Sequence, residues 1–218
     1  MKKIAVILAG CGRLDGSEIH ESVLTLLSIE QNDAQFQCFS LDLPQHHVTN
    51  HLSEEMEAGE TRNMLIESAR IARGNVKTLD TLDVKQFDAL IIPGGNGVAY
   101  NLFDLALTGN KYRVNPIVKK TCLDFTQQGK PVGFICIAPA MLPKIYDKEV
   151  ELTIGKDKEL AHLLTELGAK HFTCEVDQIH VDTQHKIVTT PAYMLAKNVA
   201  QAYTGIKKLV DKVIALTN

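Results

Sequence analysis

The sequence predicts an α/β domain, in which a largely parallel sheet is covered by helices on both faces. Short apolar runs such as Ile4–Ala9 and Val132–Ile135 are typical of strands that are buried on both sides. Between such runs lie segments whose apolar residues recur at helical spacing, and this alternation favours a parallel sheet. No repeat, low-complexity segment or linker divides the sequence, so we predict one domain spanning residues 1–218.

The first half of the chain alternates between strand-like and helix-like segments. We expect strands at Lys3–Ala9, Gln35–Ser40, Val76–Leu79 and Phe87–Ile92, and helices at about Glu18–Gln31 and Thr61–Arg73. In the first helix, the apolar residues Ile19, Val23 and Leu26–Leu27 share helical spacing, which predicts that they face the sheet. Residues 41–59 are polar and irregular, which indicates a surface loop or a short helix.

The second half continues the same alternation. We expect helices at Val98–Leu105, Pro116–Gln128, Glu159–Leu167 and Ala192–Leu216, and strands at Val132–Ile135, Leu152–Ile154, Ile179–Val181 and Lys186–Thr190. A break of the last helix is expected near Thr204–Gly205. The last two strands flank residues 182–185, which is typical of a hairpin.

Composition and charge exclude several classes of partner. Hydrophobic residues make up 45% of the chain and charged residues 22%, and the net charge is −3, so we expect neither a nucleic-acid partner nor a membrane partner. The start of the chain resembles a lipoprotein signal, with Leu8–Cys11 at the cleavage position. Its apolar run, Ile4–Ala9, is shorter than the roughly 7–15 residues of a signal-peptide core, so a first buried strand is favoured.

The five cysteines are an odd number, widely spread, with no Cys-x-x-Cys pair. This pattern argues against a disulfide framework and a structural zinc site and favours a reducing compartment, so we predict a cytoplasmic protein. His46, His47 and His51 are close enough in sequence to be candidate metal ligands. The segment lacks the glutamate of a zincin helix, however, and is better explained as a solvated loop. We therefore predict no metal.

Cys136 is the strongest candidate for a catalytic residue. It follows the apolar run Val132–Ile135 directly, and Pro139 suits the first turn of a helix behind it. Strand, reactive residue and helix start form the layout of a nucleophile elbow, and a helix N-terminus favours the thiolate. The alternative is a structural cysteine at the end of a core strand, because free cysteines are often buried.

Other candidates lie at the carboxyl ends of the strands, where sheets of this kind bind ligands. Gly94 and Gly95 follow a buried strand, and their amides together with that of Ile137 could form an oxyanion hole. The alternative for this glycine pair is simply a tight strand-to-helix turn. Gly12, in the turn after the first strand, and Thr190, at the end of the last strand, are further candidates for the cleft.

Glu18 opens the first helix, at the carboxyl end of the first strand. A carboxyl there could orient the thiol of Cys136 or shuttle a proton, although acids at helix N-termini commonly serve only the helix dipole. His20 could reach the mouth of the cleft. The glycine turn before Glu18, Gly10–Gly16, is one residue longer than a dinucleotide-binding fingerprint, so we expect no nucleotide cofactor.

Together, the stretches Asp88–Gly95, Gly133–Ala138 and Gly16–Glu18 resemble the ThiJ/PfpI-type branch of the class I glutamine amidotransferase-like superfamily. The resemblance extends over nearly the whole chain to one family within it. Gly10–Glu21, Glu60–Asn63, Cys136–Lys144, Leu152–Gly155 and Ile187–Leu195 are similar to ElbB-type isoprenoid biosynthesis proteins with an amidotransferase-like domain, also described as bacterial glyoxalases.

This resemblance implies a flavodoxin-like three-layer sandwich that is usually a homodimer. It places the elbow nucleophile on Cys136, its hydrogen-bonding glutamate on Glu18 and the oxyanion amides near Gly95 and Ile137. The implied activity is that of a lyase that converts a small dicarbonyl, glyoxal, to glycolate without glutathione, metal or other cofactor.

The sequence lacks the catalytic bases that other branches of the superfamily carry. Ile137 stands where protease-like relatives carry a histidine directly after the cysteine, and residues 189–192 replace the late histidine and glutamate of amidotransferases. Protease and glutaminase activities are therefore disfavoured. The alternative to a glyoxalase is a non-catalytic protein of isoprenoid metabolism that responds to oxidation at Cys136 or acts through a partner.

Overall fold

A mostly parallel sheet of seven strands forms the centre of the molecule, as the computed structural model shows for residues 1–146 and 149–217. The strand order is β3-β2-β1-β4-β5-β9-β8, and only β8 runs antiparallel to its neighbour. The strands are β1 Lys3–Leu8, β2 Gln35–Ser40, β3 Val76–Thr78, β4 Ala89–Ile92, β5 Val132–Ile135, β8 His180–Asp182 and β9 Ile187–Thr190. This confirms the predicted α/β sandwich.

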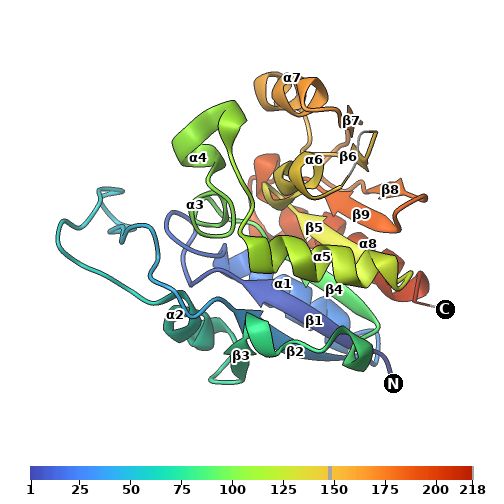
Figure 1. The fold of residues 1–218 in the computed structure, drawn as a ribbon, viewed down its shortest axis with the longest axis horizontal. Coiled ribbons are helices and arrows are strands. Elements are labelled where there is room, and N and C mark those ends of the chain that lie inside the picture. Colours follow the sequence, from blue (N-terminus) through green and yellow to red (C-terminus); the bar gives the residue numbers. More distant parts are fainter. Residues whose placement is uncertain (147–148, 218) are drawn as a thin grey trace.

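Helices cover both faces of the sheet (Figure 1). They are α1 Ile19–Glu30, α2 Met64–Ile71, α3 Val98–Asn101, α4 Leu105–Thr108, α5 Pro116–Gln127, α6 Leu142–Ile145, α7 Lys158–Glu166 and α8 Val199–Ala215. A small second sheet pairs β6, Glu151–Leu152, with β7, Lys170–His171. None of the described helices is long and apolar enough to cross a membrane.

Alternate residues of the central strands supply two separate cores. In β1, Ile4 and Val6 belong to the core beneath α1 and α8, whereas Ala5 and Ile7 belong to the core beneath α5. This follows from the pleat of a strand, which points successive side chains to opposite faces. A strand covered on both faces must be apolar throughout, which is why these runs could be recognised in the sequence.

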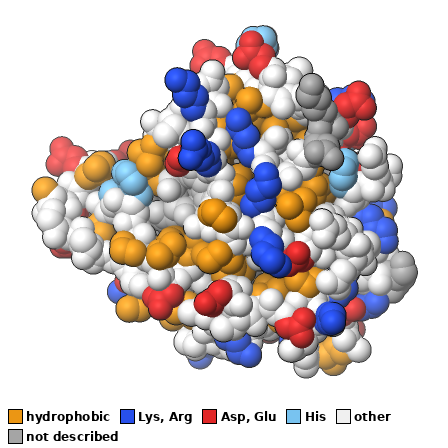
Figure 2. Space-filling model, in the orientation of Figure 1, with side chains coloured by type: hydrophobic (Ala, Val, Ile, Leu, Met, Phe, Trp, Pro, Cys, Tyr) orange, Lys and Arg blue, Asp and Glu red, His pale blue; other side chains and the backbone are white. Residues whose placement is uncertain are grey.

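The α5 face carries lysine and arginine side chains scattered among apolar ones (Figure 2). Residues 41–63 leave the edge of the sheet as an irregular excursion held by isolated bridges at Pro44–Asn63 and Thr49–Met56, so the loop interpretation is correct and the short-helix alternative is not (Figure 1). The excursion is tied to the turn after β1, because Asp15 accepts a hydrogen bond from the Thr49 N–H at 2.8 Å.

The C-terminal helix differs from the prediction in where it begins and in being unbroken. Residues 192–194 form a separate 3₁₀ turn, and α8 begins only at Val199, with Asn198 as its N-cap. No break occurs at Thr204–Gly205. Gly205 instead allows α8 to lie close to the sheet, because a Cβ there would come within 2.5 Å of the Val176 carbonyl oxygen.

Candidate active site

Cys136 stands at a sharp bend directly after β5. Its φ of +62° lies in the left-handed region that non-glycine residues rarely adopt, and its N–H donates to the Thr190 carbonyl of β9 at 2.9 Å. Such strain typically costs about 1–3 kcal/mol and is concentrated at functional sites. The backbone therefore has the geometry of the predicted nucleophile elbow. The segment behind it is a 3₁₀ turn, Ala138–Met141, followed by the short α6, so the expected helix N-terminus is much weaker than predicted.

Two backbone amides face the sulfur of Cys136. The N–H groups of Gly95 and Ile137 hydrogen bond to it and lower the pKa of the thiol. The turn after β4 can approach this closely only without side chains, because a Cβ on Gly94 would lie 2.5 Å from the Cys136 Cβ. At Gly95, a Cβ would lie 2.5 Å from the Glu18 nitrogen. Of the three amides predicted for an oxyanion hole, those of Gly95 and Ile137 are thus beside the sulfur, whereas the Gly94 N–H donates to Glu21 instead.

Glu21, which the sequence analysis did not single out, is the carboxyl group bonded to the thiol. Its side chain is fully buried and hydrogen bonds with Cys136. Its Oε2 accepts from the Gly94 N–H at 3.0 Å, and its Oε1 accepts from the Tyr193 N–H at 3.1 Å. The sequence contained no signal for it beyond its place one turn after Glu18, because the apolar pattern of α1 predicted that a different face would turn toward the sheet.

Glu18, predicted to hold the thiol, has a different position. Its Oε2 accepts a 2.6 Å hydrogen bond from the Glu21 N–H, so it is the N-cap of α1. The carboxylate turns toward the free N–H groups of its own helix, and Glu21, one turn later, reaches the sulfur instead. Glu18 still lines the same cavity as Cys136.

The sulfur opens into a cavity of about 360 Å³, a volume suited to a small metabolite. Its lining consists of Arg13, Glu18, His20, Gly95, Asn96, Cys136, Tyr193 and Met194. His20 is therefore at the cavity, as expected, whereas the other two predicted cleft residues are not. Thr190 is fully buried and donates to the Gln178 carbonyl at 2.9 Å, and Gly12 packs against Asp15 and His51.

Burial couples the protonation of Cys136 and Glu21. It raises the pKa of the Glu21 carboxyl to about 8, and the charge of Glu18 acts in the same direction. Burial, then the charge and hydrogen bond of Glu21, raise the pKa of the Cys136 thiol well above its ordinary value. Near pH 7 Glu21 is mostly protonated, and a neutral carboxyl no longer repels a thiolate. A protonated Glu21 can accept the thiol proton at one oxygen while it releases its own proton from the other, so it can relay the proton of Cys136.

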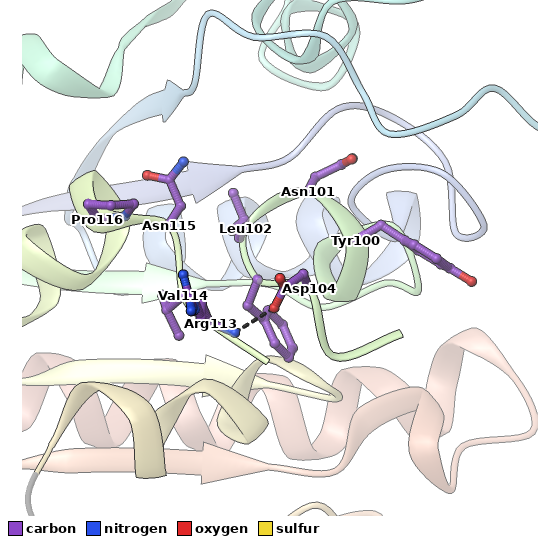
Figure 3. Close-up of a pocket in the computed structure, with 9 residues that line it drawn as sticks. Tyr100, Asn101, Leu102, Asp104, Arg113, Val114, Asn115 and Pro116 are labelled. Atoms are coloured by element: carbon purple, nitrogen blue, oxygen red, sulfur yellow. Dashed lines mark hydrogen bonds between the residues drawn. The ribbon is translucent and has the colours of Figure 1, made fainter. Parts of the chain in front are cut away.

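A second cavity, which shares no lining residue with the Cys136 cavity, offers no such chemistry. It lies between α3 and the start of α5, is lined by residues 100–104 and 113–116, and contains no cysteine or histidine (Figure 3). The hydrogen bond from the Arg113 N–H to the Asp104 carboxylate closes one of its walls.

Comparison with known proteins places the chain in a family. No protein-family model matches it. A human protein, glutamine amidotransferase-like class 1 domain-containing protein 3, mitochondrial, is 41% identical over an alignment 224 residues long, gaps included, that covers 99% of this chain and 83% of the human one. The chain belongs to the glutamine amidotransferase-like class 1 domain family.

Solved structures agree with this family and confirm the flavodoxin-like, class I glutamine amidotransferase-like fold. An isoprenoid biosynthesis protein with amidotransferase-like domain from Ehrlichia chaffeensis has a TM-score of 0.92 and 35% identity, with 100% of both chains covered. Glyoxalase III from Candida albicans shares the fold alone, with a TM-score of 0.64, 13% identity and coverage of 99% and 97%. The human relative is named as mitochondrial, so a cytoplasmic location stays a prediction.

The metal site that the loop histidines suggest in the sequence would need several ligating side chains close together. Among the described residues, no group of three or more histidine, cysteine or acidic side chains is arranged to hold a metal ion. His51 contacts the Thr49 carbonyl at 3.0 Å through Nδ1 and the Leu14 N–H at 3.3 Å through Nε2. One ring nitrogen of His51 is thus used within its own loop and the other contacts the turn after β1.

Proposed function

We propose that this member of the family is a cofactor-free glyoxalase, a lyase of hydro-lyase type that converts glyoxal and similar small dicarbonyls to hydroxy acids. The observation that carries the proposal is the position of Cys136, strained at an elbow, bonded to Glu21 and two amides, and open to a cavity of small-metabolite size. The glyoxalase fold neighbour adds support at the level of the fold.

In the proposed reaction, the Cys136 sulfur attacks one aldehyde carbon of glyoxal, and the thiol proton passes by way of Glu21 to the new hydroxyl of a hemithioacetal. The amides of Gly95 and Ile137 stabilise the developing oxyanion. Glu18, which lines the cavity, removes the proton from this carbon and returns it to the second carbon. The resulting thioester is hydrolysed by water, which releases glycolate and restores the thiol.

Steady-state kinetics on glyoxal and methylglyoxal, with the product identified by NMR, test this proposal. Wild-type protein is expected to form glycolate from glyoxal, and Cys136→Ala is expected to fall to the uncatalysed background. Cys174→Ala removes a second buried cysteine outside the cavity and is expected to retain the wild-type rate. Equal turnover by wild type and Cys136→Ala would refute the proposal.

A second candidate rests on the same hydrogen bonds. A protonated Glu21 and the amides of Gly95 and Ile137 could hold the oxygens of a Cys136 sulfinic acid, which suits a redox-responsive protein acting through a partner. The name of the Ehrlichia protein suggests isoprenoid biosynthesis as its context. Intact-mass measurement under mild peroxide separates this candidate, because it requires two oxygens to be added at Cys136 before Cys11 is modified.

A further inference from the structure

Tyr193 and His20 form a hydrogen-bonded pair at the mouth of the Cys136 cavity. The Tyr193 hydroxyl lies 2.9 Å from Nδ1 of His20, and both side chains line the cavity. Tyr193 belongs to the 3₁₀ turn after β9, whereas His20 lies in the first turn of α1. Two elements that are distant in sequence therefore place a phenol and an imidazole in the cavity that Cys136 also lines.

The backbone fixes Tyr193 in this position. Ala192, directly before it, is fully buried with a φ of +43°, which a non-glycine residue adopts only when its surroundings impose it. The Tyr193 N–H then donates to Glu21 Oε1 at 3.1 Å. The carboxyl that contacts the sulfur of Cys136 thus also holds the tyrosine, so the two side chains are kept in a fixed relation.

The proposed reaction needs an acid at this place. Removal of the proton from the hemithioacetal carbon moves negative charge onto the oxygen of the second carbonyl. No histidine follows Cys136, since Ile137 occupies that position. Partial burial and the charges of Glu18 and Glu21 raise the pKa of the Tyr193 hydroxyl, so it keeps its proton at neutral pH.

We propose that Tyr193 is a catalytic residue, the general acid for the oxygen of the second carbonyl, and that His20 is the positioning residue that orients its hydroxyl. This inference rests on the proposed glyoxalase function. With Nδ1 protonated, His20 donates to the Tyr193 oxygen and leaves the phenol O–H free to point into the cavity.

The protons balance in this scheme. Tyr193 gives its proton to the oxygen of the second carbon as Glu18 takes the proton of the first carbon, which yields a neutral enediol on the sulfur. Glu18 returns its proton to the second carbon, and the hydroxyl of the first carbon restores the proton of Tyr193 as the thioester forms. Glu18 also faces His20, with 4.0 Å between Oε1 and Nδ1, and Arg13 is the other charged group at the cavity mouth.

The test compares Tyr193→Phe and His20→Asn with wild type, using glyoxal and doubly deuterated glyoxal. Tyr193→Phe is expected to lower kcat about 100-fold at nearly unchanged KM and to raise the isotope effect, because carbon-proton transfer becomes slower. His20→Asn is expected to lose about tenfold in kcat, in line with a positioning role. The rate of Cys136 alkylation by iodoacetamide is expected to stay at the wild-type value in both.

Tyr203→Phe is the matched control. Its hydroxyl also donates to a side chain at the end of α1, the C-cap residue Gln31, at 2.7 Å, but it does not line the cavity, so wild-type kinetics are expected. Wild-type kcat and isotope effect in Tyr193→Phe would overturn the inference and leave the glyoxalase function standing. A loss of kcat with slower alkylation and an unchanged isotope effect would also overturn it. Absence of Cys136-dependent turnover in wild type would refute the function and the inference together.

Discussion

Glu21 is a carboxyl group without exposure to solvent, and its burial has a thermodynamic consequence. Its two oxygens accept from the Gly94 and Tyr193 N–H groups, and it contacts Cys136. These bonds offset only part of the cost of removing a charge from water, which is why its pKa rises from 4.5 to about 8. A residue so costly to bury is more readily explained by a role at the thiol than by stability.

The first prediction at this scale concerns stability and pH. The folded protein holds the Glu21 proton up to a higher pH than the unfolded chain does, so stability falls as the pH rises from 4.5 to 8. The contribution to the slope is up to about 1.4 kcal/mol per pH unit. Glu21→Gln cannot titrate, so its free energy of unfolding, measured by urea denaturation from pH 5 to 8, is expected to fall less steeply than that of wild type.

Thr25→Ala is the control for this experiment. Thr25 is buried in the same helix and does not titrate, so its replacement is expected to shift the stability curve by a constant amount. Parallel curves for wild type and Glu21→Gln would contradict the raised pKa of Glu21.

At the scale of elements, α1 shows what sequence patterns can and cannot predict. Its existence and extent were predicted well, because its apolar residues recur at helical spacing. Its orientation was predicted only in part: Leu26 is buried as expected, but Ile19, Val23 and Leu27 are exposed. The buried face of the helix carries Glu21 and Ile29 together with serine and threonine residues. An apolar stripe indicates a contact surface but not which surface it meets.

The same limit explains why only some of the active-site residues could be predicted from the sequence. Cys136, Gly95 and Ile137 could be placed because a buried strand followed by a tight turn fixes the backbone itself. Which carboxyl of α1 reaches the thiol depends on the rotation of the helix and on the capping bond of Glu18, and no local pattern determines either. Tyr193 was missed because its position depends on the strained φ of Ala192.

Gly205 gives a prediction for α8. Alanine within a helix is normally favoured over glycine by about 1 kcal/mol. Here its Cβ would lie 2.5 Å from the Val176 carbonyl oxygen and 2.6 Å from the Thr190 Oγ1. Gly205→Ala is therefore expected to lower the free energy of unfolding by about 1–2 kcal/mol in urea denaturation, because overpacking outweighs propensity.

The preceding residue, Thr204, supplies the control for Gly205→Ala. Thr204 is exposed on the same helix, so Thr204→Ala is expected to leave stability unchanged or to raise it by a few tenths of a kcal/mol. A Gly205→Ala variant as stable as Thr204→Ala would show that α8 does not need its close approach to the sheet.

At the scale of the whole molecule, the strand order brings the site together. β1, β4, β5 and β9 are consecutive neighbours in the sheet, and all four are parallel. Their carboxyl ends therefore meet at one edge, where the turn after β1 leads to α1 and Glu21, β4 leads to Gly95, β5 to Cys136 and β9 to Tyr193. No local segment could form this cavity alone, because each strand contributes only one part of it.

The unexplained stripe on α1 bears on the state of the molecule in solution. Ile19, Val23 and Leu27 are 43%, 48% and 41% exposed on one face of the helix. A second copy of the chain is the occupant we expect, since the homodimer was predicted from the family resemblance and a helix stripe can pack against its own two-fold copy. Light scattering coupled to size exclusion is expected to give twice the chain mass for wild type and the monomer mass for Val23→Lys.

Ile66→Lys is the matched variant in this measurement. Ile66 is an apolar residue of α2 that is 66% exposed and lies outside the α1 stripe, so its replacement is expected to leave the dimer intact. Because Ile19 precedes the cavity residue His20, separation of the dimer by Val23→Lys is also expected to change KM for glyoxal more than kcat. A wild-type protein of monomer mass at micromolar concentration, or a dimer broken equally by both variants, would exclude α1 as the contact surface.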